Sequence, residues 1–366
     1  MRSSARSTTT PFATPILLFA GLAVLFCLLG ILFVFEASVA ESHAMVGHPY
    51  HFLRQHLFGL GIGLVAAVVG YCTPPKIWVQ WSPAIFGFAA LLLVLVLIPG
   101  LGLELNGARR WLSLGPLTFQ PVEFAKFAVV AFYTAWLSKH QRVQPFLLLT
   151  GVLAMLVMLQ PDLGSLLILG GIACSMYFLA GGQMKYLLGA GACVIPLLIL
   201  LVVLSPYRWQ RVQTFINPES DPLGASYHFR QITLALGRGG VLGQGIGNSR
   251  QRFSFIPEAS TDSIFAIIAE EIGFVGSSIL ILLFILFFWV GYRNVMRSAA
   301  SDTERLLGLG LLAWLSLQTA LNISAVVGLV PLTGIPLPFF SYGRTSQVMI
   351  LFATGILIRI AKARKS

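Results

Sequence analysis

Charged residues are scarce in this chain of 366 residues. Only 10% of them are Asp, Glu, Lys or Arg, and only 13 are acidic. A soluble globular domain carries about 25% charged residues, so the composition excludes that class. Apolar residues instead make up 57% of the sequence, and the mean hydropathy is +0.84. The composition is that of a membrane protein.

Cysteine is rare as well, which excludes a disulfide framework and a cysteine-based metal site. The four cysteines lie in or beside apolar runs at no metal-like spacing, as small buried apolar residues do: Cys27, Cys72, Cys174 and Cys193. The histidines within residues 43–56 could bind zinc. No cysteine or carboxylate pair completes their ligand set, which favours an interfacial loop. No motif in the sequence predicts a metal site.

Apolar segments of about 20 residues, the length that an α-helix needs to cross a bilayer, recur along the chain. We count ten: 15–38, 53–71, 78–98, 121–138, 145–160, 163–181, 186–205, 272–292, 305–329 and 342–360. They are continuous, whereas the strands of a β-barrel would alternate. The sequence predicts an all-α, polytopic integral membrane protein with about ten transmembrane helices. Residues 1–366 would form a single membrane domain, with one large extracytoplasmic loop, 206–262, between spans seven and eight.

The first apolar run has a second interpretation as a cleaved signal peptide. Residues 38–40 (Ser-Val-Ala) resemble a signal-peptidase site. The run from 16 to 35 is longer than the apolar region of a usual signal peptide, which favours an uncleaved first span.

The distribution of Lys and Arg indicates the orientation, because these residues concentrate on the cytoplasmic side of membrane proteins. An even number of spans places both termini on one side. The tails and short loops of that side carry most of the cations: Arg2, Arg6, Lys76, Lys139, Arg142, Lys185, Arg293, Arg297, Arg305, Arg359, Lys362, Arg364 and Lys365. We therefore predict cytoplasmic termini. The net charge of +11 suits contact with anionic membrane lipid, and no nucleic-acid-binding motif accompanies it.

Charged residues mark the starts of two predicted spans. Glu123 and Lys126 are three residues apart, so they share one helix face and can form an ion pair. The pair either neutralises itself or lines a polar cavity, and intramembrane charges favour the cavity. Asp162 precedes the sixth span, where it could cap the helix, line the same cavity, or do both.

The predicted loop 206–262 is rich in arginine and glycine. Its arginines are Arg208, Arg211, Arg230, Arg238, Arg250 and Arg252. Guanidinium groups suit bidentate phosphate recognition, although a solvated basic loop that meets lipid headgroups is the alternative. The glycines at 239–247 loosely resemble a dinucleotide-binding pattern, but they lack its strand and helix context. A tightly turning loop is the better interpretation.

Four of the few acidic residues lie within residues 253–276: Glu258, Asp262, Glu270 and Glu271. A carboxylate at the mouth of a membrane helix is costly to place, which points to a functional site. Asp262 follows two good helix-start residues and precedes an apolar run. It either caps this helix or, as an anion facing a sugar hydroxyl, acts as a general base.

Several long motifs resemble the SEDS family (shape, elongation, division and sporulation proteins), whose members are FtsW, RodA and SpoVE. The motifs are NGARRWL at 106–112, QPVEFAK at 120–126, QPDLG at 160–164, GQGIGNSRQ at 243–251, IPEA at 256–259 and TGIPLPFFSYG at 333–343. They span nearly the whole chain. The resemblance implies a ten-span bacterial cytoplasmic membrane protein that polymerises peptidoglycan glycan strands from lipid II.

The resemblance also implies roles for particular residues. Asp262 matches the essential aspartate of the family, which would act as the base in an inverting glycosyl transfer that releases undecaprenyl diphosphate. The residues expected to bind substrate are Glu123, Lys126, Asp162, Arg208, Arg211, Gln251 and Arg252. A divalent cation, Mg²⁺ or Mn²⁺, is expected to assist. A class B penicillin-binding protein, which supplies the transpeptidase, is the expected partner.

The chain departs from the family pattern around Asp262, at Arg344 and at Arg252, which stands where Lys is common. Ser260 and Ser263 flank Thr261-Asp262 where the family usually has His and Phe, and Arg344 stands in a motif that is usually Gly-Gly-Ser-Ser. The motifs around 248–251 and 257–259 lean toward the division branch, FtsW. A lipid II flippase or transporter, or a non-catalytic division scaffold, is the alternative function. The polar residues gather at the outer ends of the predicted spans, which favours chemistry there.

Overall fold

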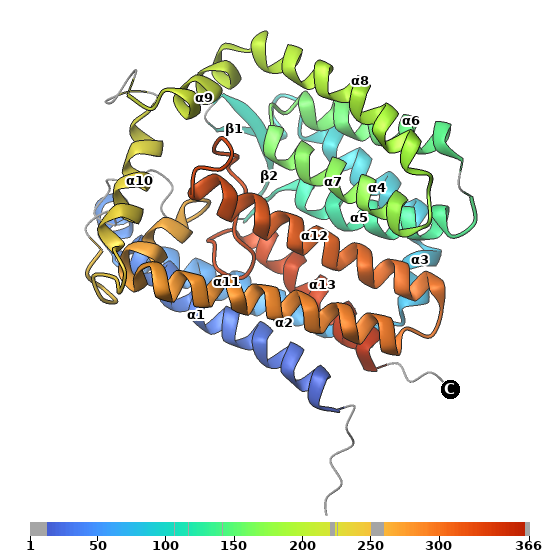
Figure 1. Cartoon of the computed structure of the whole chain (residues 1–366), viewed down its shortest axis with the longest axis horizontal. Helices are drawn as coiled ribbons and strands as arrows, with labels where there is room; N and C mark the ends of the chain where they lie inside the picture. Colours follow the sequence, from blue (N-terminus) through green and yellow to red (C-terminus); the bar gives the residue numbers. More distant parts are fainter. Residues whose placement is uncertain are drawn as a thin grey trace, which may run out of the picture.

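A computed structural model describes residues 13–105, 107–115, 117–140, 142–219, 224, 226–249 and 260–362. The fold is mostly helical (Figure 1). Its longer helices are α1 (Ala13–Val46), α2 (His51–Cys72), α4 (Ser82–Leu95), α5 (Pro121–Leu137), α6 (Val143–Met158), α7 (Leu163–Leu179), α8 (Met184–Val203), α11 (Ile264–Ser298), α12 (Asp302–Val326) and α13 (Arg344–Lys362).

Six of the described helices are long and apolar enough to cross a membrane: α1, α2, α8, α11, α12 and α13. They coincide with predicted spans one, two, seven, eight, nine and ten. The other four predicted spans fall on shorter helices, namely α3 (Pro75–Gln80) with α4, α5, α6 and α7. The prediction of a polytopic, mostly helical membrane protein is confirmed.

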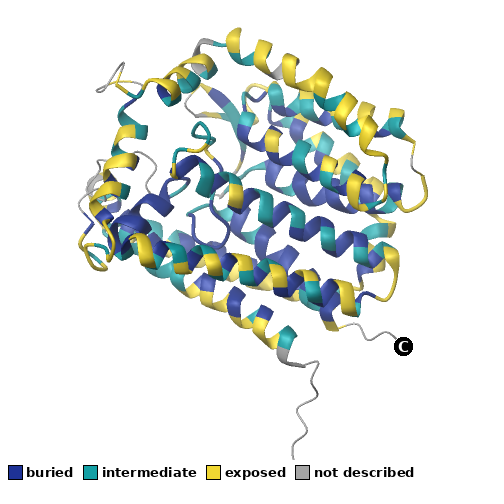
Figure 2. Cartoon of the chain, in the orientation of Figure 1, coloured by how far each residue is buried: buried dark blue, intermediate teal, exposed yellow. Residues whose placement is uncertain are grey.

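The core lies around α5, and the periphery is apolar but exposed (Figure 2). Most side chains of α5 are buried, including both of its charged residues. No described side chain of α8 is buried, although this helix is strongly apolar, as a lipid-facing helix is. Close packing of α2 on α13 depends on small residues, since a Cβ atom at Gly355 would lie 2.0 Å from the carbonyl oxygen of Ala67.

A small β-sheet corrects the all-α prediction. Strands β1 (Gly102–Leu105), β2 (Ala108–Leu114) and β3 (Leu117–Phe119) form a three-stranded antiparallel sheet in the order β1-β2-β3. The segment between spans three and four is too polar for a span and contains the β-favouring residues Trp111, Thr118 and Phe119. Gly115, with a φ of 68°, supplies the left-handed conformation at the turn from β2 to β3.

The predicted loop 206–262 also contains structure, because α9 (Pro206–Ile216) and α10 (Tyr227–Gly239) form within it. The glycine-rich segment after α10 turns tightly, as predicted. It docks on α11 where that helix breaks at Gly273, whose φ is 68°. The amide of Gln244 donates to the carbonyl of Glu270 at 3.0 Å, and the amide of Phe274 donates to Gly240 at 2.9 Å. These bonds satisfy backbone groups that the break leaves without helical partners.

The bundle has two distinct ends (Figure 1). At one end, Asn294 Nδ2 near the end of α11 donates to the carbonyl of Pro15 at 3.1 Å, and Lys362 Nζ near the end of α13 donates to the Tyr71 hydroxyl at 2.6 Å. The described chain therefore begins and ends at this end. The sheet, α9, α10 and the segment 327–343 lie at the opposite end.

Candidate functional site

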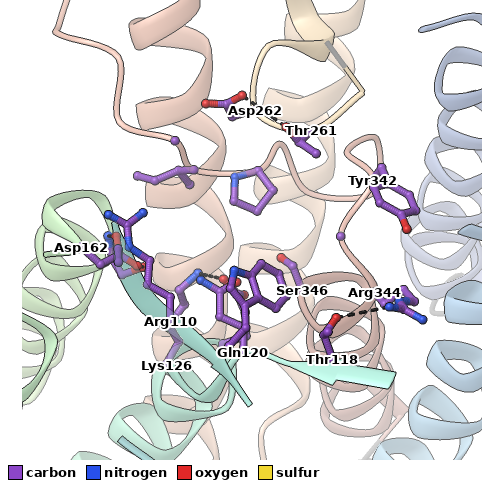
Figure 3. A pocket seen from close by; sticks show the side chains of 18 of the residues that line it. Arg110, Thr118, Gln120, Lys126, Asp162, Thr261, Asp262, Tyr342, Arg344 and Ser346 are labelled. Atoms are coloured by element: carbon purple, nitrogen blue, oxygen red, sulfur yellow. Dashed lines mark hydrogen bonds and ion pairs between the residues drawn. The ribbon is translucent and has the colours of Figure 1, made fainter. Parts of the chain in front are cut away.

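A cavity of about 390 Å³ opens at the end of the bundle that carries the sheet (Figure 3). The sheet, the starts of α5, α7 and α13, helix α9 and the loops before α11 and α13 all contribute to its wall. Its charged lining residues are Arg110, Glu123, Lys126, Asp162, Arg211, Asp262 and Arg344. Five of these seven residues are among the predicted site residues. The structure therefore brings together side chains from segments that lie far apart in the sequence.

The predicted ion pair of α5 is present at the floor of the cavity. Lys126 Nζ donates to Glu123 Oε1 at 2.6 Å, and both residues are 1% exposed. Lys126 Nζ also donates to Gln318 Oε1 of α12 at 3.0 Å, and the Gln318 amide donates to the Pro336 carbonyl at 3.0 Å. Buried charges are tolerated when they are paired, as these are, although Glu123 Oε2 has no hydrogen-bond partner among the described residues. The pair thus joins α5 to α12 and to the loop that leads to α13.

Asp162 lies both at the start of α7 and in the wall of the cavity. It is the N-cap of α7, where its Oδ1 accepts from the amide of Ser165 at 3.0 Å and its Oδ2 accepts from the Ser165 hydroxyl at 2.7 Å. It also lines the cavity. The cap fixes the direction of this carboxylate, because both of its oxygens are held by Ser165.

Arg110 of β2 is a cavity residue that the site prediction missed. Its Nε donates to the Gln160 carbonyl at 3.2 Å, and its Nη2 donates to the carbonyl of Pro161. These bonds aim the guanidinium past the start of α7, and Figure 3 shows it beside Asp162. The neighbouring Arg109 instead pairs with Glu104 at 3.0 Å on the exposed side of the sheet. Side chains alternate between the two faces of a strand, so the two neighbouring arginines point to opposite sides of the sheet. In the sequence, the motif at 106–112 is the feature that could have indicated a role for Arg110.

Asp262 lies just before α11 and is only 9% exposed. Asn322 Nδ2 of α12 holds its backbone by donating to the Asp262 carbonyl at 2.7 Å, and it donates to the Ile335 carbonyl at the same distance. The N-cap residue of α11 is Ser263, and it makes no side-chain cap bond. The geometry therefore does not favour the cap interpretation of Asp262. A glycine at 334, with a φ of 71°, places no side chain between Asp262 Oδ2 and the cavity.

The electrostatics of Asp262 are set by burial and by Arg211. Burial raises the pKa of the Asp262 carboxyl, while the Arg211 guanidinium and the hydroxyls of Ser263 and Thr261 lower it. Burial has the largest effect, so the pKa lies above its usual range. Arg211 of α9 lines the cavity, and its Nη1 donates to the Leu332 carbonyl at 2.9 Å. A carboxylate with a raised pKa in a cavity is a candidate general base.

Of the other predicted site residues, the structure describes only Arg208. Arg208 of α9 donates to the Leu201 carbonyl at 3.2 Å and lies outside the lining. Burial and the nearby Arg110 guanidinium lower the pKa of Arg208. Gln251 and Arg252 lie outside the described residues.

Arg344, a departure from the family pattern, lies on the opposite wall from Arg110 (Figure 3). Its Nη2 donates to Thr118 Oγ1 of β3 at 3.2 Å. Its side chain packs on α2, where a Cβ atom at Gly59 would lie 3.1 Å from Arg344 Cγ. Tyr342 lines the cavity beside it and donates its hydroxyl to Gln55 Oε1. Guanidinium groups thus face the cavity from two sides, which suits an anionic ligand.

The described residues do not assemble a metal site of their own. Among them, no group of three or more His, Cys, Asp or Glu side chains lies close enough to hold a metal ion. Glu123 is engaged by Lys126, and both oxygens of Asp162 are engaged by Ser165. Two cavity carboxylates of the described chain could still contact a cation: Asp262, and Glu123 through its Oε2, which has no hydrogen-bond partner among the described residues.

Comparison with known proteins identifies relatives that match almost the whole chain. A family model described as "Cell cycle protein" (FtsW/RodA/SpoVE) matches residues 16–366. The chain is 35% identical over 366 residues to "Stage V sporulation protein E" of Bacillus subtilis, which covers 97% of this chain and 99% of that protein. It is 38% identical over 345 residues to "Probable peptidoglycan glycosyltransferase FtsW" of Coxiella burnetii, covering 91% of this chain and 92% of that protein.

Solved structures share the fold. One is described as "Structural coordination of polymerization and crosslinking by a peptidoglycan synthase complex"; the TM-score is 0.76 at 29% identity, over 94% of this chain and 96% of that chain. The rod shape determining protein RodA of Thermus thermophilus gives a TM-score of 0.70 at 26% identity, over 95% of this chain and 97% of that chain. From the family match, the extended sequence identity and the shared fold, the chain belongs to the SEDS family of FtsW, RodA and SpoVE proteins.

Proposed function

We propose that the protein is a peptidoglycan glycosyltransferase that polymerises glycan strands from lipid II on the outer face of the bacterial cytoplasmic membrane. One observation carries the proposal: a buried carboxylate, Asp262, shares a cavity with Arg110, Arg211 and Lys126. This arrangement combines a candidate base with cations for a diphosphate. Relatives at 36–38% identity carry the name "Probable peptidoglycan glycosyltransferase FtsW", which supports the reaction and the division branch.

The proposed orientation has ten spans and places the cavity outside. In addition to the six long apolar helices, α3 with α4, α5, α6 and α7 would complete the set. The cations of the predicted inner loops, such as Lys76, Arg305 and Arg359, lie at the end opposite the cavity. Since Lys and Arg concentrate on the cytoplasmic side, this end is the cytoplasmic one. Residues 1–366 then form one membrane domain.

In the proposed reaction, Asp262 removes the proton from the 4-hydroxyl of the acceptor's terminal N-acetylglucosamine. The resulting oxygen attacks C1 of the N-acetylmuramic acid at the end of the growing strand, with inversion. The bond from C1 to undecaprenyl diphosphate breaks, and the diphosphate leaves with the electron pair. Arg110, Arg211 and Lys126 would stabilise its developing charge. So good a leaving group needs no carboxylic acid to protonate it, unlike the aglycone of a glycoside hydrolase.

A divalent cation, Mg²⁺ or Mn²⁺, remains an expectation of the proposal. Among the described residues, no group of three or more His, Cys, Asp or Glu side chains is placed to hold a metal ion. Mg²⁺ is commonly bound through one or two carboxylates together with substrate phosphates. We therefore assign the cation no step, and the proposed chemistry depends on the residues of the chain itself.

The proposed partner is a class B penicillin-binding protein that crosslinks the strands. Support comes from the similar fold of a chain in a peptidoglycan synthase complex whose description names polymerization and crosslinking. A role as a division scaffold is compatible with catalysis. A flippase is the alternative of a different class, and it would use polar groups nearer the middle of the membrane.

Reconstitution tests the proposal. The purified chain, with and without a class B partner, is mixed with fluorescent lipid II and Mg²⁺ or Mn²⁺, and products are resolved on a gel. A ladder of glycan strands is expected. If no ladder forms under any condition while labelled lipid II crosses the leaflets of liposomes that contain the protein, the polymerase proposal is wrong and the flippase is right.

The pH dependence of polymerisation should report the environment of Asp262. A base works when deprotonated, and burial raises the pKa of this carboxyl, so the rate should fall on acidification at a pH above the usual carboxyl value of about 3.9. Arg211 lowers this pKa. Arg211→Gln should therefore move the acidic limb to higher pH, in addition to slowing the reaction. Arg230→Gln, an exposed change on α10, serves as the control. An unshifted limb in Arg211→Gln would contradict the assignment.

Arg344 should contribute to substrate binding. Replacing it by Gly, the residue usual in the family, removes one cavity guanidinium and its bond to Thr118. A charge-assisted hydrogen bond contributes about 1.5–3 kcal/mol, so we expect KM for lipid II to rise about tenfold with little change in kcat. Arg109→Gln, on the exposed side of the sheet that also contains Thr118, is the control. Equal KM values for Arg344→Gly and the unmodified protein would exclude this role.

A further inference from the structure

A chain of hydrogen bonds leads from Asp262 away from the cavity to a histidine. Ser263 Oγ lies 3.3 Å from Asp262 Oδ1, and His228 Nε2 lies 2.8 Å from Ser263 Oγ. Ser263 is the N-cap residue of α11, yet its hydroxyl makes no cap bond. Serine is among the preferred N-cap residues because its oxygen accepts from the helix amides. Here the hydroxyl instead links a carboxylate to an imidazole, which is unusual for this position.

The fold holds His228 against Ser263. His228 lies in the first turn of α10, and Ile232 and Ala235 of that helix are buried. At the far end of α10, a Cβ atom at Gly239 would lie 2.2 Å from the Ala269 carbonyl of α11, so the two helices are in direct backbone contact. The bond from the Gln244 amide to the Glu270 carbonyl fastens the following turn to α11 as well. The separation between His228 and Ser263 is therefore set by packing along α10 and α11.

The burial of these residues indicates a direction for proton movement. Asp262 is 9% exposed and Ser263 is 1% exposed, whereas His228 is half-buried. A base that takes one proton in each turnover must lose it before the next. A buried carboxyl under a bound substrate exchanges poorly with water, and imidazole is a side chain that commonly shuttles protons. Of the three residues in this chain of hydrogen bonds, His228 is thus the most exposed.

We propose that His228 and Ser263 form a proton relay that resets Asp262 after each glycosyl transfer. The protonated Asp262 gives its proton to Ser263 Oγ while the Ser263 hydroxyl gives its own proton to the neutral Nε2 of His228. The carboxylate is regenerated, Ser263 is unchanged overall, and the imidazolium releases its proton to water. Among the described residues, the charged neighbour of Asp262 is Arg211 of α9, and the contacts from α12 come from the neutral Asn322.

The relay rests on the proposed glycosyl transfer but makes a separate kinetic prediction. Because it acts after bond formation, its loss should leave the first turnover intact and slow the later ones. His228→Gln keeps a hydrogen-bonding side chain that cannot carry the proton, and Ser263→Ala removes the link. General acid–base assistance contributes about 10²–10⁴-fold, and a slower direct route to water would remain, so we expect steady-state turnover to fall about tenfold.

The experiment is rapid mixing of the purified, active protein with fluorescent lipid II, which resolves the first glycosidic bond from later ones. The expected result for both variants is a first bond formed within about twofold of the normal rate, followed by slow turnover. Exogenous imidazole should restore turnover to His228→Ala and not to Ser263→Ala. His140→Gln, an exposed histidine after α5 at the opposite end of the bundle, should behave as the unmodified protein.

Two outcomes would overturn the relay alone. One is normal steady-state turnover in both variants. The other is an equal slowing of the first and later bonds without imidazole rescue, which would make His228 and Ser263 residues that only position Asp262. If the unmodified protein forms no glycosidic bond, the proposed function fails, and the relay fails with it.

Discussion

Asp262→Asn should abolish strand polymerisation and leave the protein folded in the membrane. The asparagine side chain has nearly the same shape but cannot accept the proton of the acceptor hydroxyl. Loss of a general base costs about 10²–10⁴-fold in rate, which would remove a visible product ladder from the lipid II gel. The fold should survive, since Asn322 holds the backbone carbonyl of residue 262 and not its side chain.

The thermal stability of the same variant distinguishes a base from a structural carboxylate. Burial raises the pKa of Asp262, which means that the folded protein disfavours the anion relative to the unfolded chain. Above this pKa, the uncharged asparagine side chain of the variant should therefore leave the melting temperature unchanged or raise it. Glu104→Gln, an exposed carboxylate of the sheet, is the control, and it should retain normal activity. If Asp262→Asn polymerises normally, or if it loses activity only because it unfolds, Asp262 is not the general base.

Local sequence patterns predicted the parts of this site that are local in sequence. The ion pair of Glu123 and Lys126 follows from their spacing of three residues in a helix, and the cap at Asp162 follows from its position before an apolar run. Apolar runs likewise located the long helices, because about 20 continuous apolar residues have few alternatives to a membrane helix.

Contacts between distant segments were not predictable in this way. Arg110 meets the carbonyls of residues 160 and 161, and Arg211 acts on Asp262 from a separate helix. The distances along the chain between these partners do not follow the repeat of a helix or of a strand. The sequence predicts a loop at α9 and α10 because these helices are short and polar. It does not predict the sheet because the strands have only three to seven residues. Periodicity over so few residues is weak.

The departure at Ser263 shows what the structure adds to a motif. From the sequence, Ser263 is one more residue that suits a helix start. In the fold, its hydroxyl lies between Asp262 and His228, which are 34 positions apart in the chain. The proposed role of serine at position 263, where the family usually has Phe, depends on its contact with His228. That contact is created by the packing of α10 on α11.

Breaking the buried ion pair should be the most destabilising change in the site. Lys126→Met leaves the Glu123 carboxylate without its cation in a place that is 1% exposed, and Glu123→Gln leaves the Lys126 ammonium in the same position. Removing one partner of a buried pair costs about 3–5 kcal/mol, which is a large share of a typical folding free energy of about 5–15 kcal/mol. Each single variant should therefore melt at a clearly lower temperature in detergent and yield less monodisperse protein.

The double variant Glu123→Gln/Lys126→Met separates stability from function. Replacing both charges removes the uncompensated ion, so most of the lost stability should return, as it does when a buried pair is exchanged for neutral residues. Gln318 would still lose the donor at its Oε1, although Trp314 Nε1 continues to donate to that oxygen at 3.0 Å. Activity should not return with stability, because the cavity then lacks the Lys126 charge that we assign to the leaving diphosphate. A double variant that is both stable and fully active would confine the pair to a structural role, joining α5 to α12. The chemistry at the diphosphate would then rest on Arg110 and Arg211.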